Sequence, residues 1–382
     1  MITTINNEHQ ELNFSSEREQ SQACLNSAEH EKNQGRKVLN VPNLRFPEFQ
    51  GEWEEYRIED ITENISSGRC KSHSPNGKYN LYGSTGIIGK TDEACYEGNL
   101  VLVARVGANA GSLQIINELC GITDNTLIIK PKEVNAQYLY FFLQHFNLNR
   151  LIFGSGQPLI TGGMLKKVKV SLGTVQEQNK LTKLLSLLDE RIATQNKIID
   201  KLQSLIKGIA QKIVHSNKTN VHLSECVECS SSTLQESDVC EHGAYPVYGA
   251  NGIVGYLDNY NTEGEAVYII KDGSGVGTVS YVTGKCSATG TLNTLQAKEG
   301  YSLQYLYYLL KVFNFEPYKT GMAIPHIYFK DYGKVKVFCP SYTEQLQYAR
   351  LLSAIDSELS IEKNFLTSLS LQKQYLLRHM FI

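Results

Sequence analysis

One long internal repeat constrains the fold of this chain more than any other feature. Residues 79–89, YNLYGSTGIIG, recur as residues 245–255, YPVYGANGIVG, at an offset of 166. Residues 137–143, QYLYFFL, recur as residues 304–310, QYLYYLL, at an offset of 167. Because the offset drifts by so little between distant anchors, one ancestral unit is present twice, with a period far longer than that of a solenoid. The sequence therefore predicts a duplicated domain in a pseudo-two-fold arrangement.

Each copy begins with a segment rich in glycine, tyrosine and short apolar runs. Such runs, with many β-branched residues, predict buried strands. Strands are expected at residues 100–103, 127–129, 266–270 and 335–337. Leucine and aromatic residues at helical spacing predict short helices at residues 137–146 and 303–312. This mixture predicts a compact α/β globule in each copy.

Each copy ends in a long amphipathic helix, at residues 174–214 and 341–381. Apolar residues follow the a, d and e positions of a heptad, interrupted by polar Gln195 in the first helix and Glu362 in the second. About 40 residues at 1.5 Å each make a rod of roughly 60 Å. The stripe needs a partner, and the simplest partner is the other helix, packed antiparallel. The residues expected in this coiled coil are Leu181, Leu184, Leu188, Ile198, Leu202, Leu205, Ile209, Leu351, Ile355, Leu359, Phe365, Leu369 and Leu376.

The first turn of each long helix carries the signature of a capping box. Thr174 is followed three residues later by Glu177, and Ser341 is followed at the same spacing by Glu344. In this motif the hydroxyl accepts a hydrogen bond from the N3 amide, and the glutamate accepts one from the N-cap amide. Both helices are therefore expected to begin at these residues.

These elements divide the chain into five segments. They are a polar leader at residues 1–43, expected to be mobile, a globular domain at 44–172, a spacer helix at 173–215, a second globular domain at 216–339 and a second spacer helix at 340–382. The predicted fold class is α+β: two similar globular α/β domains separated by two long helices packed as an antiparallel coiled coil. Two unrelated surface helices, each lying on its own domain, are the alternative.

Composition excludes several classes of protein. The formal net charge is −2, so the chain is not a polycation that coats nucleic acid by charge alone. No apolar run approaches the roughly 18 residues that cross a bilayer, and the first residues lack the layout of a signal peptide. The nine cysteines are an odd number and are scattered, which argues against a secreted disulfide framework and favours the cytoplasm.

No motif of an enzyme is complete in the sequence. Gly89, Lys90 and Thr91 resemble the end of a phosphate-binding loop, but Ser84 stands where that loop has its first glycine. The signatures of amino-methyltransferases, zinc proteases and serine hydrolases are absent. The sequence therefore indicates none of these activities.

Four residues of the second copy mimic the spacing of a zinc site. They are Cys226, Cys229, Cys240 and His242. In the alignment of the two copies Cys226 matches Ile61, and a cysteine that replaces isoleucine is usually a small core residue. We therefore expect no metal site.

An ordered set of motifs, most of them present twice, resembles one known protein family. The set includes VPNLRFPEF at residues 41–49 and the pattern Y-x-x-Y-G-x-x-G-x-x-G in each copy. It also includes GSGQPLI at residues 154–160 and its counterpart TGMAIPHI at residues 320–327. With the two capped helices, these motifs are similar to those of specificity subunits of type I restriction-modification systems, over residues 41–382.

The resemblance implies a non-catalytic subunit that reads DNA. Each globular domain would read one half of a bipartite, gapped target, and the helix pair would fix the gap. The implied partners are double-stranded DNA, two methyltransferase subunits and restriction/translocase subunits, with no membrane. S-adenosylmethionine, ATP and magnesium would be held by those partner subunits, and this chain would hold no cofactor.

Polar side chains suited to reading DNA gather at the glycine-rich loops of both copies. Base edges are read by Arg, Lys, Asn, Gln, Ser and Thr, and glycine lets the backbone approach the duplex. The candidate DNA-binding residues are Ser67, Arg69, Lys71, Ser84, Thr85, Arg105, Asn109, Gln157, Asn251, Lys271, Ser274, Lys319, Thr320 and His326. Simpler roles stay open, because strand-end cations such as Arg105 and Lys271 are often merely solvated and His326 suits loop packing.

A duplicated interaction scaffold without DNA readout is the main alternative function. The helices of the two copies agree in the phase of their apolar residues, whereas loops such as residues 117–121 and 284–290 differ. This pattern favours two recognition surfaces of different specificity. An enzyme that uses Arg105 or Lys271 with nearby hydroxyls is a further alternative, and it would show turnover without partners.

Overall fold

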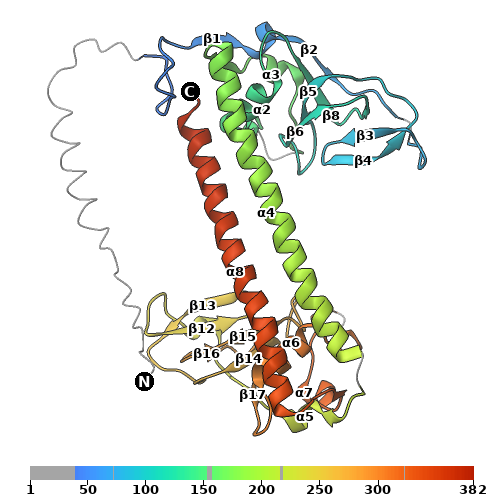
Figure 1. The fold of residues 1–382 in the computed structure, drawn as a ribbon, viewed down its shortest axis with the longest axis vertical. Coiled ribbons are helices and arrows are strands. Elements are labelled where there is room, and N and C mark those ends of the chain that lie inside the picture. Colours follow the sequence, from blue (N-terminus) through green and yellow to red (C-terminus); the bar gives the residue numbers. More distant parts are fainter. Residues whose placement is uncertain (1–38, 72, 153–156, 216–217, 322) are drawn as a thin grey trace, which may run out of the picture. The chain divides into compact units, whose positions relative to one another are not determined.

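The computed structural model describes residues 39–71, 73–152, 157–215, 218–321 and 323–382. Residues 1–38, most of the predicted leader, lie outside the described residues. Tertiary contacts divide the chain into two units, Met1–Thr182 with Leu376–Ile382 and Lys183–Tyr375 (Figure 1). Within the described ranges, no helix is long and apolar enough to cross a membrane.

The first unit is built on an antiparallel sheet of four strands in the order β2-β8-β5-β6. The strands are β2 (Thr62–Ser67), β5 (Asn99–Ala104), β6 (Leu113–Asn117) and β8 (Thr126–Pro131). Every residue of β5 after Asn99 is buried, as the continuous apolar run predicts for an inner strand that is covered on both faces.

Two smaller sheets complete the strands of the first unit. One has the order β4-β3-β7, in which β3 pairs with β4 antiparallel and with β7 parallel. The other joins β1 to β9. Their bounds are β1 (Glu54–Arg57), β3 (Tyr79–Gly83), β4 (Gly86–Thr91), β7 (Gly121–Ile122) and β9 (Lys169–Leu172).

Helix α2 anchors the apolar core of the first unit. The Asn135 side chain caps it by accepting hydrogen bonds from the amides of Gln137 and Tyr138. Near the chain end, the Phe381 ring lies 5.2 Å from that of Tyr138 and 6.3 Å from that of Phe142. The short helices described in this unit are η1 (Ile58–Ile61), α2 (Ala136–Phe146), η2 (Leu148–Leu151) and α3 (Gly162–Lys166).

The second unit repeats the same topology. Its sheets have the orders β11-β17-β14-β15, β13-β12-β16 and β10-β18. The strands are β10 (Val221–His222), β11 (Val227–Ser231), β12 (Tyr245–Gly249), β13 (Gly252–Leu257), β14 (Ala266–Ile270), β15 (Val279–Val282), β16 (Ser287–Ala288), β17 (Leu292–Ala297) and β18 (Lys336–Val337). Its short helices are α5 (Leu223–Cys226), η3 (Glu236–Asp238), α6 (Leu303–Lys311), η4 (Glu316–Tyr318) and α7 (Phe329–Tyr332). The predicted duplication is therefore confirmed strand by strand.

The duplication extends to single hydrogen bonds in the cores of the units. The hydroxyl of buried Tyr138 donates to the Ser171 carbonyl at 2.7 Å, and that of buried Tyr305 donates to the Phe338 carbonyl at 2.7 Å. A buried tyrosine needs such a partner because its hydroxyl has lost water. In each copy, therefore, a backbone carbonyl accepts the hydrogen bond of the buried tyrosine hydroxyl.

The long helices are α4 (Val175–His215) and α8 (Tyr342–His379). Within the second unit they run antiparallel: Lys373 pairs with Asp189 at 2.6 Å, and Gln195 Nε2 donates to the Glu362 carbonyl at 3.2 Å. Gln195 also donates to the Glu362 carboxylate, so the two predicted polar interruptions of the stripe meet each other. The predicted antiparallel packing of two long helices is confirmed.

The buried seam of these helices follows one edge of the predicted stripe. In two pairs of adjacent apolar residues of α4 the second is the more buried: Ile199 is 7% exposed and Ile206 5%. Their neighbours Ile198 and Leu205 are 37% and 48% exposed, which shifts the seam by one residue from the prediction there. Of the other predicted seam residues, Leu181, Leu359 and Leu369 are buried, Leu184, Leu188, Leu202, Ile209, Ile355 and Leu376 are partly buried, and Leu351 and Phe365 are exposed.

The caps of the two helices differ in one respect. At α8 the box is complete, because the Glu344 amide donates to Ser341 Oγ at 3.4 Å and the Ser341 amide donates to Glu344 Oε2 at 3.1 Å. At α4 the Glu177 amide donates to Thr174 Oγ1 at 3.3 Å, but the Glu177 carboxylate accepts from Arg45 instead. The first copy thus uses its capping glutamate to hold a residue that precedes β1.

Candidate nucleic-acid interface

Backbone hydrogen bonds bring several polar loops of the first unit together at one turn, residues 123–126. The Arg105 amide donates to the Asn125 carbonyl at 2.9 Å, and the Gly68 amide donates to the Thr126 carbonyl at 3.0 Å. The Thr123 amide donates to the Tyr82 carbonyl at the end of β3, at 3.0 Å. We call residues 66–71, 82–87, 105–110, 123–126 and 157–160 the first loop cluster.

Arg105 follows the buried strand β5 and is the best-placed cation of the first loop cluster. Its carbonyl accepts from the Ile160 amide at 2.8 Å, so both backbone groups are fixed by neighbouring loops. Its Nη1 lies 3.5 Å from Ser67 Oγ, which is long for a hydrogen bond, and its buried Nε has no partner among the described residues. A guanidinium has five donors, and most of those of Arg105 are unused by the described residues.

Gly68 allows the segment that carries Ser67, Arg69 and Lys71 to approach the turn. A Cβ atom at Gly68 would lie 2.3 Å from the Thr123 carbonyl oxygen, so any side chain there would collide with backbone. Of the predicted residues in this cluster, Arg69, Lys71, Thr85, Asn109 and Gln157 are exposed, and Ser67, Ser84 and Arg105 are partly buried. The loops thus bring the predicted residues of the first copy to one cluster.

The second unit builds an equivalent cluster with the same backbone contacts. The Lys271 amide donates to the Thr291 carbonyl at 2.9 Å, and the Lys271 carbonyl accepts from the Ile327 amide at 2.9 Å. The Thr289 amide donates to the Tyr248 carbonyl at 2.9 Å, as Thr123 does to Tyr82. We call residues 231–235, 248–253, 271–276, 289–291, 319–321 and 323–327 the second loop cluster.

Several predicted side chains of the second loop cluster already make polar contacts with neighbouring residues. Lys319 pairs with Glu316 at 2.5 Å, and His326 places Nδ1 3.2 Å from the Ile324 carbonyl. The partly buried Lys271 forms no ion pair or side-chain hydrogen bond within the described ranges. Asn251, Ser274 and Thr320 are exposed, and Lys319 and His326 are partly buried. Lys271 is therefore the cation of this cluster that remains available to a ligand.

A polar brace steadies the β3–β4 hairpin beside the first loop cluster. Glu118 accepts hydrogen bonds from the Tyr82 hydroxyl and, at 2.9 Å, from Asn80 Nδ2. Burial, followed by the hydrogen bond to Glu118, raises the pKa of Tyr82 to about 12, and the same hydrogen bond lowers the pKa of Glu118. The second unit has Pro246 in place of Asn80 and Gly284 in place of Glu118, so it has no such brace.

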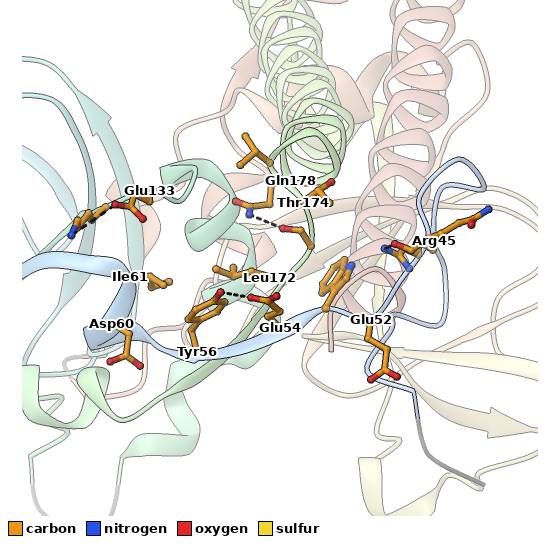
Figure 2. Close-up of a pocket in the computed structure, with 15 residues that line it drawn as sticks. Arg45, Glu52, Glu54, Tyr56, Asp60, Ile61, Glu133, Leu172, Thr174 and Gln178 are labelled. Carbon is orange, nitrogen blue, oxygen red and sulfur yellow. Dashed lines mark hydrogen bonds and ion pairs between the residues drawn. The ribbon is translucent and has the colours of Figure 1, made fainter.

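A pocket of about 360 Å³ lies apart from the first loop cluster, at the start of α4 (Figure 2). Figure 2 shows Tyr56 hydrogen-bonded to Glu54 and Gln178 near the first turn of α4. Carboxylates outnumber cations in the lining, which consists in part of Arg45, Glu52, Glu54, Asp60, Lys132 and Glu133. This charge does not suit a polyanion such as DNA, so the pocket does not extend the candidate interface.

The cysteines that mimic zinc spacing have different surroundings. Cys226 is buried with its Sγ 3.7 Å from that of Cys339, whereas Cys229 is partly buried and Cys240 is exposed. The hydrogen bond between the thiols lowers the pKa of Cys226 and raises that of Cys339. Among the residues that the structure describes, no three His, Cys, Asp or Glu side chains are grouped as metal ligands.

Comparisons with known proteins agree on one family. The family model described as type I restriction modification DNA specificity domain matches residues 50–204 and again residues 216–370. A putative type I specificity subunit from Mycoplasma genitalium is 26% identical over 342 residues, which is 81% of this chain and 88% of that protein. One from Mycoplasma pneumoniae is 25% identical, over 81% of this chain and 90% of its own length.

A solved structure shares the fold. The crystal structure of the S subunit of a type I restriction-modification system from M. genitalium has a TM-score of 0.68 and covers 90% of this chain and 99% of its own. Its sequence identity is 20%, so this likeness supports the architecture and not the choice of ligand.

Proposed function

Because the chain belongs to the family of type I restriction-modification DNA specificity domains, we propose that each of its units reads one half of a bipartite, gapped DNA target. The observation that carries this proposal is the equivalence of Arg105 and Lys271. Each follows an inner, buried strand of its unit, and each is fixed by two backbone hydrogen bonds to flanking loops. Both cations have donors that the described residues leave unused.

The differences between the two loop clusters support two different half-sites. Direct readout uses hydrogen bonds to base edges, whereas contacts to phosphate set only the register. The first loop cluster offers Arg69, Lys71 and Arg105, and the second offers Lys271 beside Asp272. Two clusters on one scaffold with unlike side chains are expected to select an asymmetric target.

The proposal includes partner subunits that supply the chemistry and part of the affinity. Two methyltransferase subunits and restriction/translocase subunits would hold S-adenosylmethionine, ATP and magnesium, and this chain would hold no cofactor and act in the cytoplasm. Affinity for DNA rests largely on neutralised phosphates. Because the net charge is only −2, the isolated chain is expected to bind weakly.

Mapping of methylated bases tests the proposal. The chain is combined with its methyltransferase subunits, random DNA is modified, and methylated positions are located by long-read sequencing. We expect one motif with two specified parts separated by unspecified bases, and no motif when this chain is left out. An uninterrupted motif, or the same motif without this chain, would contradict the proposal and favour an interaction scaffold.

A further inference from the structure

In each unit a β-hairpin of the three-stranded sheet, β3–β4 or β12–β13, ends in an isoleucine that folding leaves exposed, and we call each hairpin a ribbon. Ile87 follows the turn between β3 and β4 and is 57% exposed. Ile253 follows the turn between β12 and β13 and is 53% exposed. Single exposed apolar residues are common on protein surfaces, but here the same exposure occurs at the same place in both copies.

The backbone presents the two isoleucines in the same way. The residue before each of them is a glycine with positive φ, +112° at Gly86 and +101° at Gly252. Only glycine adopts this region freely, so both turns have a defined shape. Both ribbons also shift register at the same place, between Leu81 and Tyr82 in the first unit. The two ribbons therefore hold their exposed isoleucines in the same backbone conformation.

The two residues of the turn differ between the copies, while the isoleucine is the same in both. The turn is Ser84-Thr85 in the first unit and Ala250-Asn251 in the second. Full burial of an isoleucine is worth about 2 kcal/mol, and among the described residues neither Ile87 nor Ile253 gains this in full. An apolar residue shared by both copies, beside turn residues that differ, is the pattern expected where one contact is common to both surfaces and the others are specific.

The charged side chains of the first loop cluster favour one class of ligand for the first ribbon. The ribbon is tied to the turn at residues 123–126, which also fixes Arg105. Arg69 and Lys71 are exposed in the same loop cluster, and Asp124 is the single acid in that turn. Three cations against one acid in the loop cluster that the ribbon joins favour a polyanion over an apolar protein surface.

On the basis of the proposed function, we infer that each ribbon enters the major groove and that Ile87 and Ile253 contact the 5-methyl group of a thymine. The major groove is about 12 Å wide and admits two strands, and the third strand of each sheet pairs with only two residues of the hairpin. The thymine methyl is the apolar group that this groove displays, and the minor groove displays none. The isoleucines would thus read a thymine in each half-site, and the varied turn residues would read its neighbours.

Replacement of thymine by deoxyuridine tests this inference, because it removes only the methyl group. Binding is measured for the full complex with its methyltransferase subunits, on target duplexes in which one thymine at a time is replaced. We expect one thymine in each half-site whose replacement weakens binding about fourfold, the value of one buried methyl group. Ile87→Ala should abolish the effect in one half, and Ile253→Ala should abolish it in the other.

A matched control separates this contact from general surface changes. Val175 is 58% exposed on α4, so Val175→Ala should leave the response to deoxyuridine unchanged. The inference is overturned if no replacement weakens wild-type binding, or if both isoleucine variants keep the full response. Failure of the proposed function has a different signature, because the wild-type complex would then bind target and scrambled duplexes equally.

Discussion

Arg45 and Glu177 form a bidentate ion pair, with Nε 2.7 Å from Oε1 and Nη2 2.8 Å from Oε2. Glu177 is 2% exposed and the Arg45 side chain is 15% exposed, so water screens the pair little. Arg45 also donates to the Gly51 carbonyl at 2.6 Å. The contact with Glu177 raises the pKa of Arg45. The pair therefore holds the segment before β1 against the first turn of α4.

Loss of this pair is expected to destabilise the protein. Arg45→Met would leave a buried carboxylate without its partner, and such changes cost about 3 kcal/mol. Urea unfolding of the variant would measure the loss. Arg57→Met is the matched control, because the Arg57–Glu59 pair is exposed and should contribute less than about 1 kcal/mol. Equal effects of the two substitutions would contradict this interpretation of the buried pair.

Adjacent apolar residues in the long helices are expected to differ sharply in their contribution to stability. Ile206→Ala and Ile199→Ala remove buried side chains and should each cost about 2–4 kcal/mol. Leu205→Ala and Ile198→Ala act on exposed side chains and should each cost less than about 1 kcal/mol. Thermal unfolding of the four variants measures the difference, and similar losses within each neighbouring pair would show that the seam lies elsewhere.

Acid is expected to weaken the attachment of the chain end to α2. Burial lowers the pKa of His145, whose ring stacks on Phe381 at 5.8 Å. The folded state therefore favours the neutral imidazole, while the unfolded chain takes up a proton near pH 6.5. This contribution to stability is complete above that pH and is lost as the pH falls towards the lower folded pKa.

The variant His145→Gln provides the test of this pH dependence. Urea midpoints of wild type and variant are compared between pH 7.5 and pH 5.5. We expect the wild type to lose more stability than the variant over this interval, because glutamine does not titrate. If the two proteins lose the same amount, His145 does not contribute to the acid response.

The sequence predicts the elements of this protein better than their pairings. The repeat, the buried strands and the long helices follow from periodicity, because periodicity reports which residues share a face. Adjacent pairs such as Leu205 and Ile206 fit two neighbouring heptad phases, so periodicity alone could not decide which residue faces the seam. Only the packing against the partner helix resolves that choice.

The candidate site could be predicted by residue type but not by contact. Arg105 and Lys271 stand out as cations at the ends of apolar runs, and the repeat pairs them. The bond of Arg45 to Glu177 spans 132 residues and has no local signal. Ile87 and Ile253 look like ordinary strand residues in the sequence, and only the structure shows that the described residues leave more than half of each side chain exposed.

Salt is expected to affect the isolated chain and the complex differently. Each phosphate contact makes the slope of log affinity against log salt concentration more negative by about 0.9. Because the net charge of this chain is −2, partner subunits are expected to supply many of these contacts. Titrations at several salt concentrations should give a shallow slope for the chain alone and a steep slope for the complex. Equal slopes for the isolated chain and the complex would contradict the expectation that partner subunits supply many of the phosphate contacts.

The central claim is that the two loop clusters read different halves of one target. It is tested most directly by mapping the methylated motif of complexes that carry Arg105→Ala or Lys271→Ala. We predict that Arg105→Ala relaxes selection in one half of the motif and Lys271→Ala in the other half, while the gap stays the same. Relaxation of the same half by both variants, or an unchanged motif with both, would contradict the account.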